Sequence, residues 1–379
     1  MKLLKIFVLL LIPLLFTGCY NKKELDNLAY VIAIGADKAD GQNLNITYQI
    51  AIPIKIAGEG NEIGSSTFTT YTVTAPSIFI ANSKVNAITS KEVNLSHLNL
   101  IIYGEELARS ELTGHINSLV SNVAIRPKTS VAVCKGTAED FLKTAAPILE
   151  TSPARFYVLA LNSYEYTAEN AKTEVLDFYT SAQSPCKDAV AVIASLSGDM
   201  ALFRGLAAFS GSKMVGEISP EMTISHLMIT NTLKNGTIYV PDAKEKDKTA
   251  SIRITPNGAC KIKVNINNNI PKIDINIPIN AHIEAFSSNT DYLDKENVEI
   301  LKNTIETELE KKIIEYLNKT IEFDSDIAGL GRFAKINYLT FDEFEKTNWK
   351  EIYKNSQFSV NFEVNMNVSK IIYHKLPNR

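Results

Sequence analysis

Histidine is scarce in this chain of 379 residues, and the five that occur are far apart. No HExxH motif and no i,i+4 pair places two imidazoles on one helix face, so the sequence gives no support for a zinc site. A GxSxG elbow, a GxxxxGKS/T phosphate loop and a GxGxxG turn after a strand are also missing. We therefore expect no catalytic residue, no cofactor and no metal. The histidines are His97, His115, His226, His282 and His374.

Cysteine is nearly as scarce, with four in the chain. Beyond residue 19 only Cys134, Cys186 and Cys260 occur, and they form neither a CxxC pair nor a dense disulfide framework. This spacing permits one bridge, but small buried thiols in an apolar core explain it more simply. We expect that disulfides do not hold this fold together.

An excess of positive charge and a second long apolar run are absent as well. Lys and Arg number 39 against 42 Asp and Glu, which gives a formal net charge of −3. This balance argues against nucleic acid as a partner. After the N-terminus no stretch approaches the roughly 20 apolar residues of a membrane-spanning helix. We expect that the polypeptide beyond that end does not cross a membrane.

What the chain does have is a basic and apolar N-terminus. Lys2 and Lys5 lead into eleven apolar residues, Ile6–Phe16, about half the length of a spanning helix and typical of a cleavable signal peptide. The following Gly18-Cys19 junction resembles the bacterial lipobox, in which the cysteine sulfur receives a diacylglycerol and the new N-terminus an acyl chain such as palmitate. We expect a signal peptide at 1–18 and lipid on Cys19; the alternative is an ordinary signal peptide with a chance cysteine.

Residues 19–198 are expected to form an N-terminal α/β region. Strands are predicted at 28–34 and 44–50, joined by an Asp40-Gly41 turn, and again near 68–73, 98–103, 129–134 and 189–196. Thr137 and Asp140 resemble a capping box that opens a helix near Ala138. Apolar residues at helical spacing mark two more helices: Ile78, Ala81, Val85 and Ile88, then Leu112, Ile116, Leu119 and Val123.

Residues 199–379 are expected to form a C-terminal region with a clearer pattern. Strands are predicted at 201–210 and 213–218, and a short helix begins with an N-cap at Ser219 and a proline at 220. Apolar and polar residues alternate at 252–254, 262–266, 273–279 and 358–368, which indicates an antiparallel sheet with one dry face. Between the last two strands, one long amphipathic helix runs from about Val298 to Ile321.

The fold class that follows is α+β. We expect several mixed modules of β-sheet flanked by helices, with the C-terminal antiparallel sheet packed on the long helix. Two smaller features stay open at this point. Asp324, Asp326 and Gly329 resemble half of a calcium loop, but the remaining ligand positions are wrong, so we interpret them as a helix-exit loop. Trp349 is either a packed core residue or an exposed contact for a partner.

Several segments in order resemble the Ger(x)C family, the lipoprotein C-subunits of spore germinant receptors. The start of the mature chain, Cys19-Tyr20-Asn21-Lys22-Lys23-Glu24-Leu25, matches the family's opening motif, with Tyr20 and Asn21 in place of its Trp and Asp. Other matching elements are Gly35-Ala36-Asp37, Gln49 to Pro53, and the run from His97 to Ala108. Further on they are Gly205 to Gly216, then Asp326, Gly329 and Gly331, and finally Trp349.

This resemblance implies a function as well as a fold. It implies a non-enzymatic subunit, held by lipid on Cys19 at the outer face of the spore inner membrane and required for germinant-triggered germination. Its partners would be a multi-span A-subunit and a transporter-like B-subunit. The family fold is similar to the one inferred above, with three α/β modules.

Two other classes of protein remain as alternatives. A solute-binding lipoprotein of an uptake system would also be anchored through Cys19, but it needs a hinged cleft between two α/β lobes. The β-rich last third and the lack of a repeated lobe argue against it. A cell-envelope hydrolase would need convergent catalytic groups, and the sequence signals none.

Overall fold

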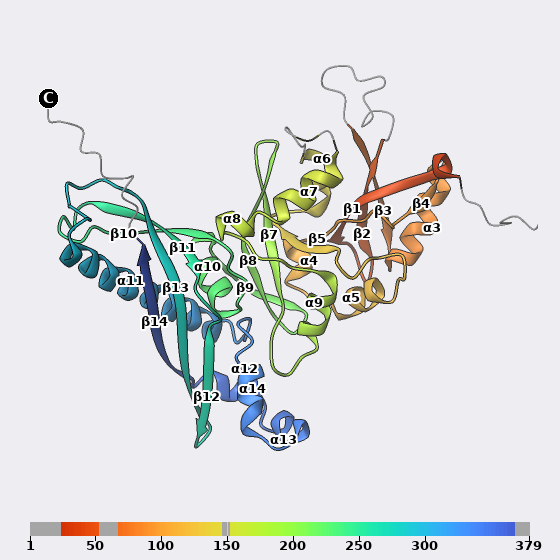
Figure 1. Cartoon of the computed structure of the whole chain (residues 1–379). Coiled ribbons are helices and arrows are strands. Elements are labelled where there is room, and N and C mark those ends of the chain that lie inside the picture. The colour runs from red at the N-terminus through yellow and green to blue at the C-terminus, as the bar shows by residue number, and fades with distance from the viewer. Residues whose placement is uncertain (1–23, 53–66, 146–149, 151, 368–379) are drawn as a thin grey trace, which may run out of the picture.

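The computed structural model describes residues 24–52, 67–145, 150 and 152–367. It contains two sheets that lie on either side of a helical layer (Figure 1). The α+β class expected from the sequence is confirmed, including the C-terminal sheet that packs on one long helix.

The first sheet has nine strands in the order β3-β2-β1-β5-β6-β7-β8-β9, with β4 paired to the start of β1. Its centre, β1-β5-β6-β7, is parallel, and its outer pairs are antiparallel. The strands are β1 Leu28–Lys38, β2 Leu44–Ala51, β3 Phe68–Ala75, β4 Glu92–Asn94, β5 Leu100–Gly104, β6 Ser130–Cys134, β7 Val190–Ser197, β8 Met200–Ser210 and β9 Lys213–Ile218.

Helices cover both faces of this first sheet. One face packs against α3 Ile78–Ile88, α5 Thr113–Val120 and α9 Val175–Ala182. The other packs against α6 Ala138–Thr144 and α7 Pro153–Leu161. The central strands are therefore mostly apolar, and all five residues of β5 are buried. The short elements η2 Leu25–Asn27, α4 Glu105–Ala108 and α8 Tyr164–Thr167 lie at the ends of strands and helices.

The second sheet has five strands, β10-β11-β13-β12, with β14 on the other side of β13. They are β10 Gly236–Pro241, β11 Thr249–Pro256, β12 Lys261–Asn267, β13 Ile270–Phe286 and β14 Gln357–Asn367. The 28-residue helix α11 Lys295–Glu322 links β13 to β14, which return parallel to each other. All other pairs are antiparallel. Along β13, buried and more exposed residues alternate, so one face is dry and the other wet.

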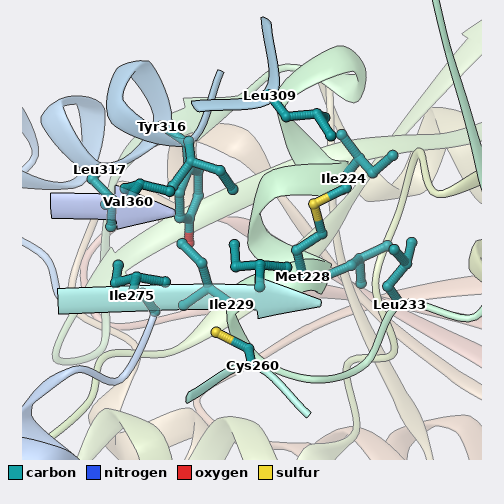
Figure 2. Close-up of a cluster of buried hydrophobic side chains, with 14 of the residues drawn as sticks. Ile224, Met228, Ile229, Leu233, Cys260, Ile275, Leu309, Tyr316, Leu317 and Val360 are labelled. Atoms are coloured by element: carbon teal, nitrogen blue, oxygen red, sulfur yellow. The ribbon is translucent and has the colours of Figure 1, made fainter. Parts of the chain in front are cut away.

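A buried helix fills the space between the two sheets. In α10 Pro220–Ile229, all seven residues from Thr223 to Ile229 are buried. Ile224, Met228 and Ile229 point into a cluster formed by α11 and by β13 and β14 (Figure 2). The same cluster includes Leu206 and Ile218 of the first sheet. One continuous apolar core therefore joins the two sheets.

The cap predictions made from the sequence are confirmed. The Thr137 hydroxyl accepts the Asp140 N–H at 3.1 Å at the start of α6. The Ser219 hydroxyl does the same for Met222 at the start of α10, at 3.3 Å. Such caps supply the acceptors that the first backbone N–H groups of a helix lack.

One predicted helix is shorter than its apolar spacing suggested. Helix α5 ends at Val120, and Val123 is fully exposed. The reason is local, because the Asn122 side chain accepts the Ala124 N–H at 3.0 Å and so favours a turn over another helical residue. The turn of the β7–β8 hairpin, at residues 198–199, is where the sequence-based division between the two regions falls. Both strands of that hairpin belong to the first sheet.

Candidate functional site: a buried aspartate junction between the two sheets

A buried polar group that connects distant parts of the chain follows the end of α11, in the loop that the sequence related to a calcium site. Asp326 is 1% exposed and accepts three hydrogen bonds. Its Oδ1 accepts the Leu330 N–H at 2.9 Å, and its Oδ2 accepts the Gly331 N–H at 2.7 Å and the Trp349 indole N–H at 2.9 Å. The carboxylate therefore closes its own loop and anchors α14 Trp349–Tyr353 to it.

Asp188, just before β7, connects this loop to the first sheet. The Asp326 N–H donates to Asp188 Oδ2 at 2.9 Å, and the Asp188 N–H donates to the Asp326 carbonyl at 2.9 Å. Asp188 Oδ1 accepts the Gly211 N–H at 2.9 Å and the Lys350 ammonium at 2.7 Å. Lys350 also donates to the Ser210 hydroxyl at 3.1 Å. Residues of the first sheet and its flank thus share one hydrogen-bond network with the segment between α11 and β14. We call this network the aspartate junction: Asp188, Ser210, Asp326, Trp349 and Lys350.

Burial controls the electrostatics of the aspartate junction. Desolvation raises the pKa of Asp326 to about 6, although its two backbone N–H donors and the indole favour the ionised form. The negative charge of Asp188 raises it further. Lys350 neutralises Asp188, whose side chain is 2% exposed. Each hydrogen bond that the structure shows to the Asp326 carboxylate comes from a donor of the protein itself. This carboxylate therefore stabilises the fold.

The two glycines of the loop are required by its geometry. A Cβ on Gly331 would lie 2.7 Å from both the Cys186 carbonyl oxygen and the Trp349 indole nitrogen. Gly329 has φ +71°, a conformation that residues with a side chain rarely adopt. The spacing of Asp326, Gly329 and Gly331 therefore encodes one compact turn over the Trp349 ring.

Trp349 is a core residue. It is 2% exposed and packs with Phe344 and Tyr353 at centroid distances of 6.3 and 5.5 Å. Of the two interpretations left open by the sequence, the buried one is correct. The neighbouring Phe323 ring lies where a Cβ of Gly216 would be, 2.3 Å from its nearest atom, so this glycine also serves the contact between the sheets.

A second buried carboxylate organises the first sheet in the same manner. Asp37, at the end of β1, accepts the N–H groups of Ala138 and Glu139 at 2.7 and 2.9 Å, and so holds the N-terminus of α6. Burial raises its pKa, and these two N–H groups oppose the rise. A Cβ on Gly35 would lie 2.9 Å from that of Ala138. The short motif Gly35-Ala36-Asp37 thus allows β1 to pack closely against the N-terminus of α6.

Gln49, in the next matched motif, is buried and uses both ends of its amide. It donates to the Leu142 carbonyl at 2.8 Å and accepts the Tyr157 hydroxyl at 2.9 Å. This places α6 and α7 on β2. Like Asp37 and Asp326, this polar motif residue fixes the packing of elements and makes no contact that suggests a substrate.

The other residues singled out by the sequence do not gather. Cys134, Cys186 and Cys260 are free and buried, as expected. Within the described residues no three His, Cys, Asp or Glu side chains are placed to hold a metal ion. The interpretation of Asp324, Asp326 and Gly329 as a helix-exit loop fits this arrangement. Cys19 lies outside the described residues. No helix in the described part of the chain is long and apolar enough to cross a membrane.

Sequence reasoning did not identify Asp188 or Lys350. They lie 138 and 24 residues away from Asp326, on the N-terminal and C-terminal sides, and neither stands in a recognisable motif. A single buried acid before a strand gives no sequence signal, because its partner is set by the tertiary structure.

The fold and the aspartate junction define a class: a two-sheet α+β protein whose buried polar residues, in the part of the chain that the structure describes, join its elements. Two family models match the chain in order. Residues 21–196 match the spore germination protein N-terminal domain, and residues 204–370 match the domain described as spore germination B3/GerAC like, C-terminal. The chain therefore belongs to the Ger(x)C family of spore germination proteins.

Individual relatives match along nearly their whole length. The chain is 24% identical to the putative spore germination protein YfkR of Bacillus subtilis, covering 93% of this chain and 92% of that one. It is 22% identical to spore germination protein GerQC of Bacillus cereus, covering 96% and 98%. The crystal structure of the GerBC protein has a similar fold, with a TM-score of 0.53, 17% identity and coverage of 88% and 96%.

Proposed function

We propose that this protein is a lipid-anchored, non-enzymatic subunit of a spore nutrient germinant receptor. It is required for germinant-triggered germination, and it acts with a multi-span A-subunit and a transporter-like B-subunit at the outer face of the spore inner membrane. The observation that carries this proposal is the presence of both family domains, in order, directly after Cys19.

The distance from the lipid to the folded body supports a close membrane contact. Five peptide bonds join Cys19 to Glu24, the first described residue. Even fully extended, they reach only about 17 Å. η2 and the start of β1, which pairs with β4 through Leu28 and Glu92, would therefore lie near the membrane (Figure 1). Such a tether raises the effective concentration of the body at membrane-bound partners.

Helix α3 belongs to the same end of the first sheet. It leads directly into β4, and its outer side exposes Phe79, Ile80 and Ile88. Exposed apolar side chains of this size are unusual in a group on a single helix and suit contact with a membrane or with a membrane-bound partner. We assign residues 1–18 to the signal peptide, 19–198 to the region nearer the membrane and 199–379 to the region further from it.

The test uses spores that lack other nutrient receptors. Deleting the gene abolishes nutrient-triggered release of dipicolinate, while release under a non-nutrient trigger is unchanged. The unaltered gene restores the response, and the Cys19→Ala variant restores little of it. Unchanged nutrient-triggered release after deletion of the whole gene contradicts the proposal and moves the solute-binding lipoprotein to first place.

A further inference from the structure

A cavity of about 230 Å³ lies beside the aspartate junction, between the first sheet and α10. Its lining includes the side chains of Lys187, Arg332 and His226, together with those of Thr173, Thr230 and Asp177. Lys187 precedes Asp188 in the chain, and Arg332 follows Gly331. The residues that form the junction thus also place two cationic side chains at one cavity.

Neither of these two cations has an acidic partner among the described residues. The structure places no carboxylate oxygen within 4.0 Å of Lys187 or of Arg332 in the part of the chain that it describes. The Arg332 Nε–H donates to the Gly329 carbonyl at 3.1 Å, which leaves the outer edge of the guanidinium available. Lys172, at the same cavity, is already paired with Glu174 at 2.6 Å. Lys187 is partly buried, which is costly for an unpaired ammonium.

The two charges are close enough to act on each other and on the buried imidazole. Arg332 lowers the pKa of Lys187, in addition to the larger effect of burial. Burial, then Lys187 and Arg332, lower the pKa of His226 to about 3, so this ring is neutral at neutral pH. Its Nδ1 lies 2.8 Å from the Tyr316 hydroxyl. In this contact the tautomer of the ring decides whether the imidazole or the hydroxyl donates.

We propose that this cavity binds a small carboxylate anion, held by Arg332 and Lys187 beside the neutral imidazole of His226. The guanidinium edge matches a carboxylate, with which it forms paired hydrogen bonds. The two cations and Asp177 leave about one net positive charge, which suits a monoanion. The volume corresponds to roughly eight waters, enough for a small organic acid. This inference does not rest on the germination role.

The test is equilibrium dialysis of the full chain, purified in detergent micelles, against radiolabelled acetate with sulfate as the competing dianion. The unaltered chain binds acetate at one saturable site, and sulfate competes poorly. Lys187→Met and Arg332→Gln each weaken binding roughly tenfold or more, by loss of a charge-assisted contact. Lys272→Met, which removes an exposed lysine of the second sheet, leaves binding unchanged.

Thermal unfolding without acetate separates a binding role from a structural one. Lys187→Met leaves the midpoint unchanged or raises it, because the substitution removes an unpaired, partly buried charge. Absence of saturable acetate binding by the unaltered chain up to about 20 mM, far above a Kd of roughly 1 mM, overturns the proposal. Equal affinity in Lys187→Met and the unaltered chain overturns it as well. Tighter binding of sulfate than of acetate would also contradict the assignment to a carboxylate monoanion.

Discussion

The two sheets of this protein meet water in different ways. The first has helices on both faces, and its central strand β5 is buried along its whole length. The second is covered on one face by α10 and α11, and its other face is wet, so its strands alternate. The first sheet is therefore enclosed on both faces, whereas the second sheet has one face open to solvent. Two features join these parts: the apolar core around α10 and the aspartate junction.

The largest effect is expected from a charge placed in each sheet. Ile102, in β5, is completely buried, and Ile102→Asp puts an unpaired carboxylate in the first sheet. We expect a loss of more than about 4 kcal/mol in the free energy of unfolding, enough to prevent folding. Far-UV circular dichroism and the yield of soluble protein measure this.

Lys272→Asp is the matched change in the second sheet. Lys272 is exposed, and its cross-strand partners Asn265 and Gln357 are uncharged. We expect a change within about 1 kcal/mol. Equal destabilisation by the two substitutions would contradict the distinction between a first sheet enclosed on both faces and a second sheet with one wet face.

The next largest effect is expected at the aspartate junction. Asp326→Ala leaves three N–H groups, those of Leu330, Gly331 and the Trp349 indole, without their acceptor, and should cost about 3–5 kcal/mol. Asp324→Ala, in the same loop but with a partly exposed side chain, is the control and should cost far less. Urea titration of the full chain measures both. If the two variants had equal midpoints, the aspartate junction would not be what couples the sheets.

The pH dependence of stability distinguishes two buried carboxylates. Asp326 has a folded pKa of about 6, above its ordinary value of 3.8, so the folded state binds its proton more tightly. Stability therefore falls as the pH rises from about 4 to about 6, by on the order of 3 kcal/mol. Asp326→Asn should remove this fall. A wild-type stability that is constant between pH 4 and pH 6 would contradict the raised pKa.

Asp242, after β10, should show the opposite dependence. Desolvation raises its pKa, but hydroxyls from Ser288, Thr290 and Tyr292 outweigh this and hold the pKa below its ordinary range. Its contribution to stability is present above pH 3.8 and is lost as the pH falls below that value. Urea midpoints of the unaltered chain and of Asp242→Asn, measured between pH 2 and pH 5, test this. The loss on acidification should be smaller in the variant.

The smallest effect is expected at a single helix cap. Thr137→Ala removes the acceptor for the Asp140 N–H at the start of α6 and should cost about 1 kcal/mol. Thr137→Ser keeps the hydroxyl and should cost much less. Because Asp37 also holds this helix start, a cost near zero for Thr137→Ala would mean that Asp37 alone is sufficient.

The second sheet could be predicted from the sequence more fully than the first. Ile273, Ile275 and Ile277 alternate with polar residues, and this pattern predicts the strands of the second sheet. Apolar residues spaced by three or four predict its long helix. Neither pattern could show that β14 runs parallel to β13, because direction depends on how α11 crosses the sheet. In the first sheet the strands were visible as apolar runs, but such runs do not reveal which strands are neighbours.

The candidate site was only partly accessible from the sequence. The motif residues Asp326, Gly329, Gly331 and Trp349 were noted, yet their common role depends on a turn that places the indole against the carboxylate. Val123 was assigned to a helix, because its spacing is helical and the competing turn at Asn122 is a local side-chain effect. Long-range pairing with Asp188 has no sequence pattern at all.

The single tryptophan gives the most direct test of the claim that the two sheets form one structural unit through the aspartate junction. Trp349 is buried at the junction, so its fluorescence, excited selectively, reports the junction, while far-UV circular dichroism reports both sheets. Both signals should be followed in one urea titration of the full chain. We predict that the two transitions coincide. A Trp349 transition complete well before the loss of the circular dichroism signal would contradict this account.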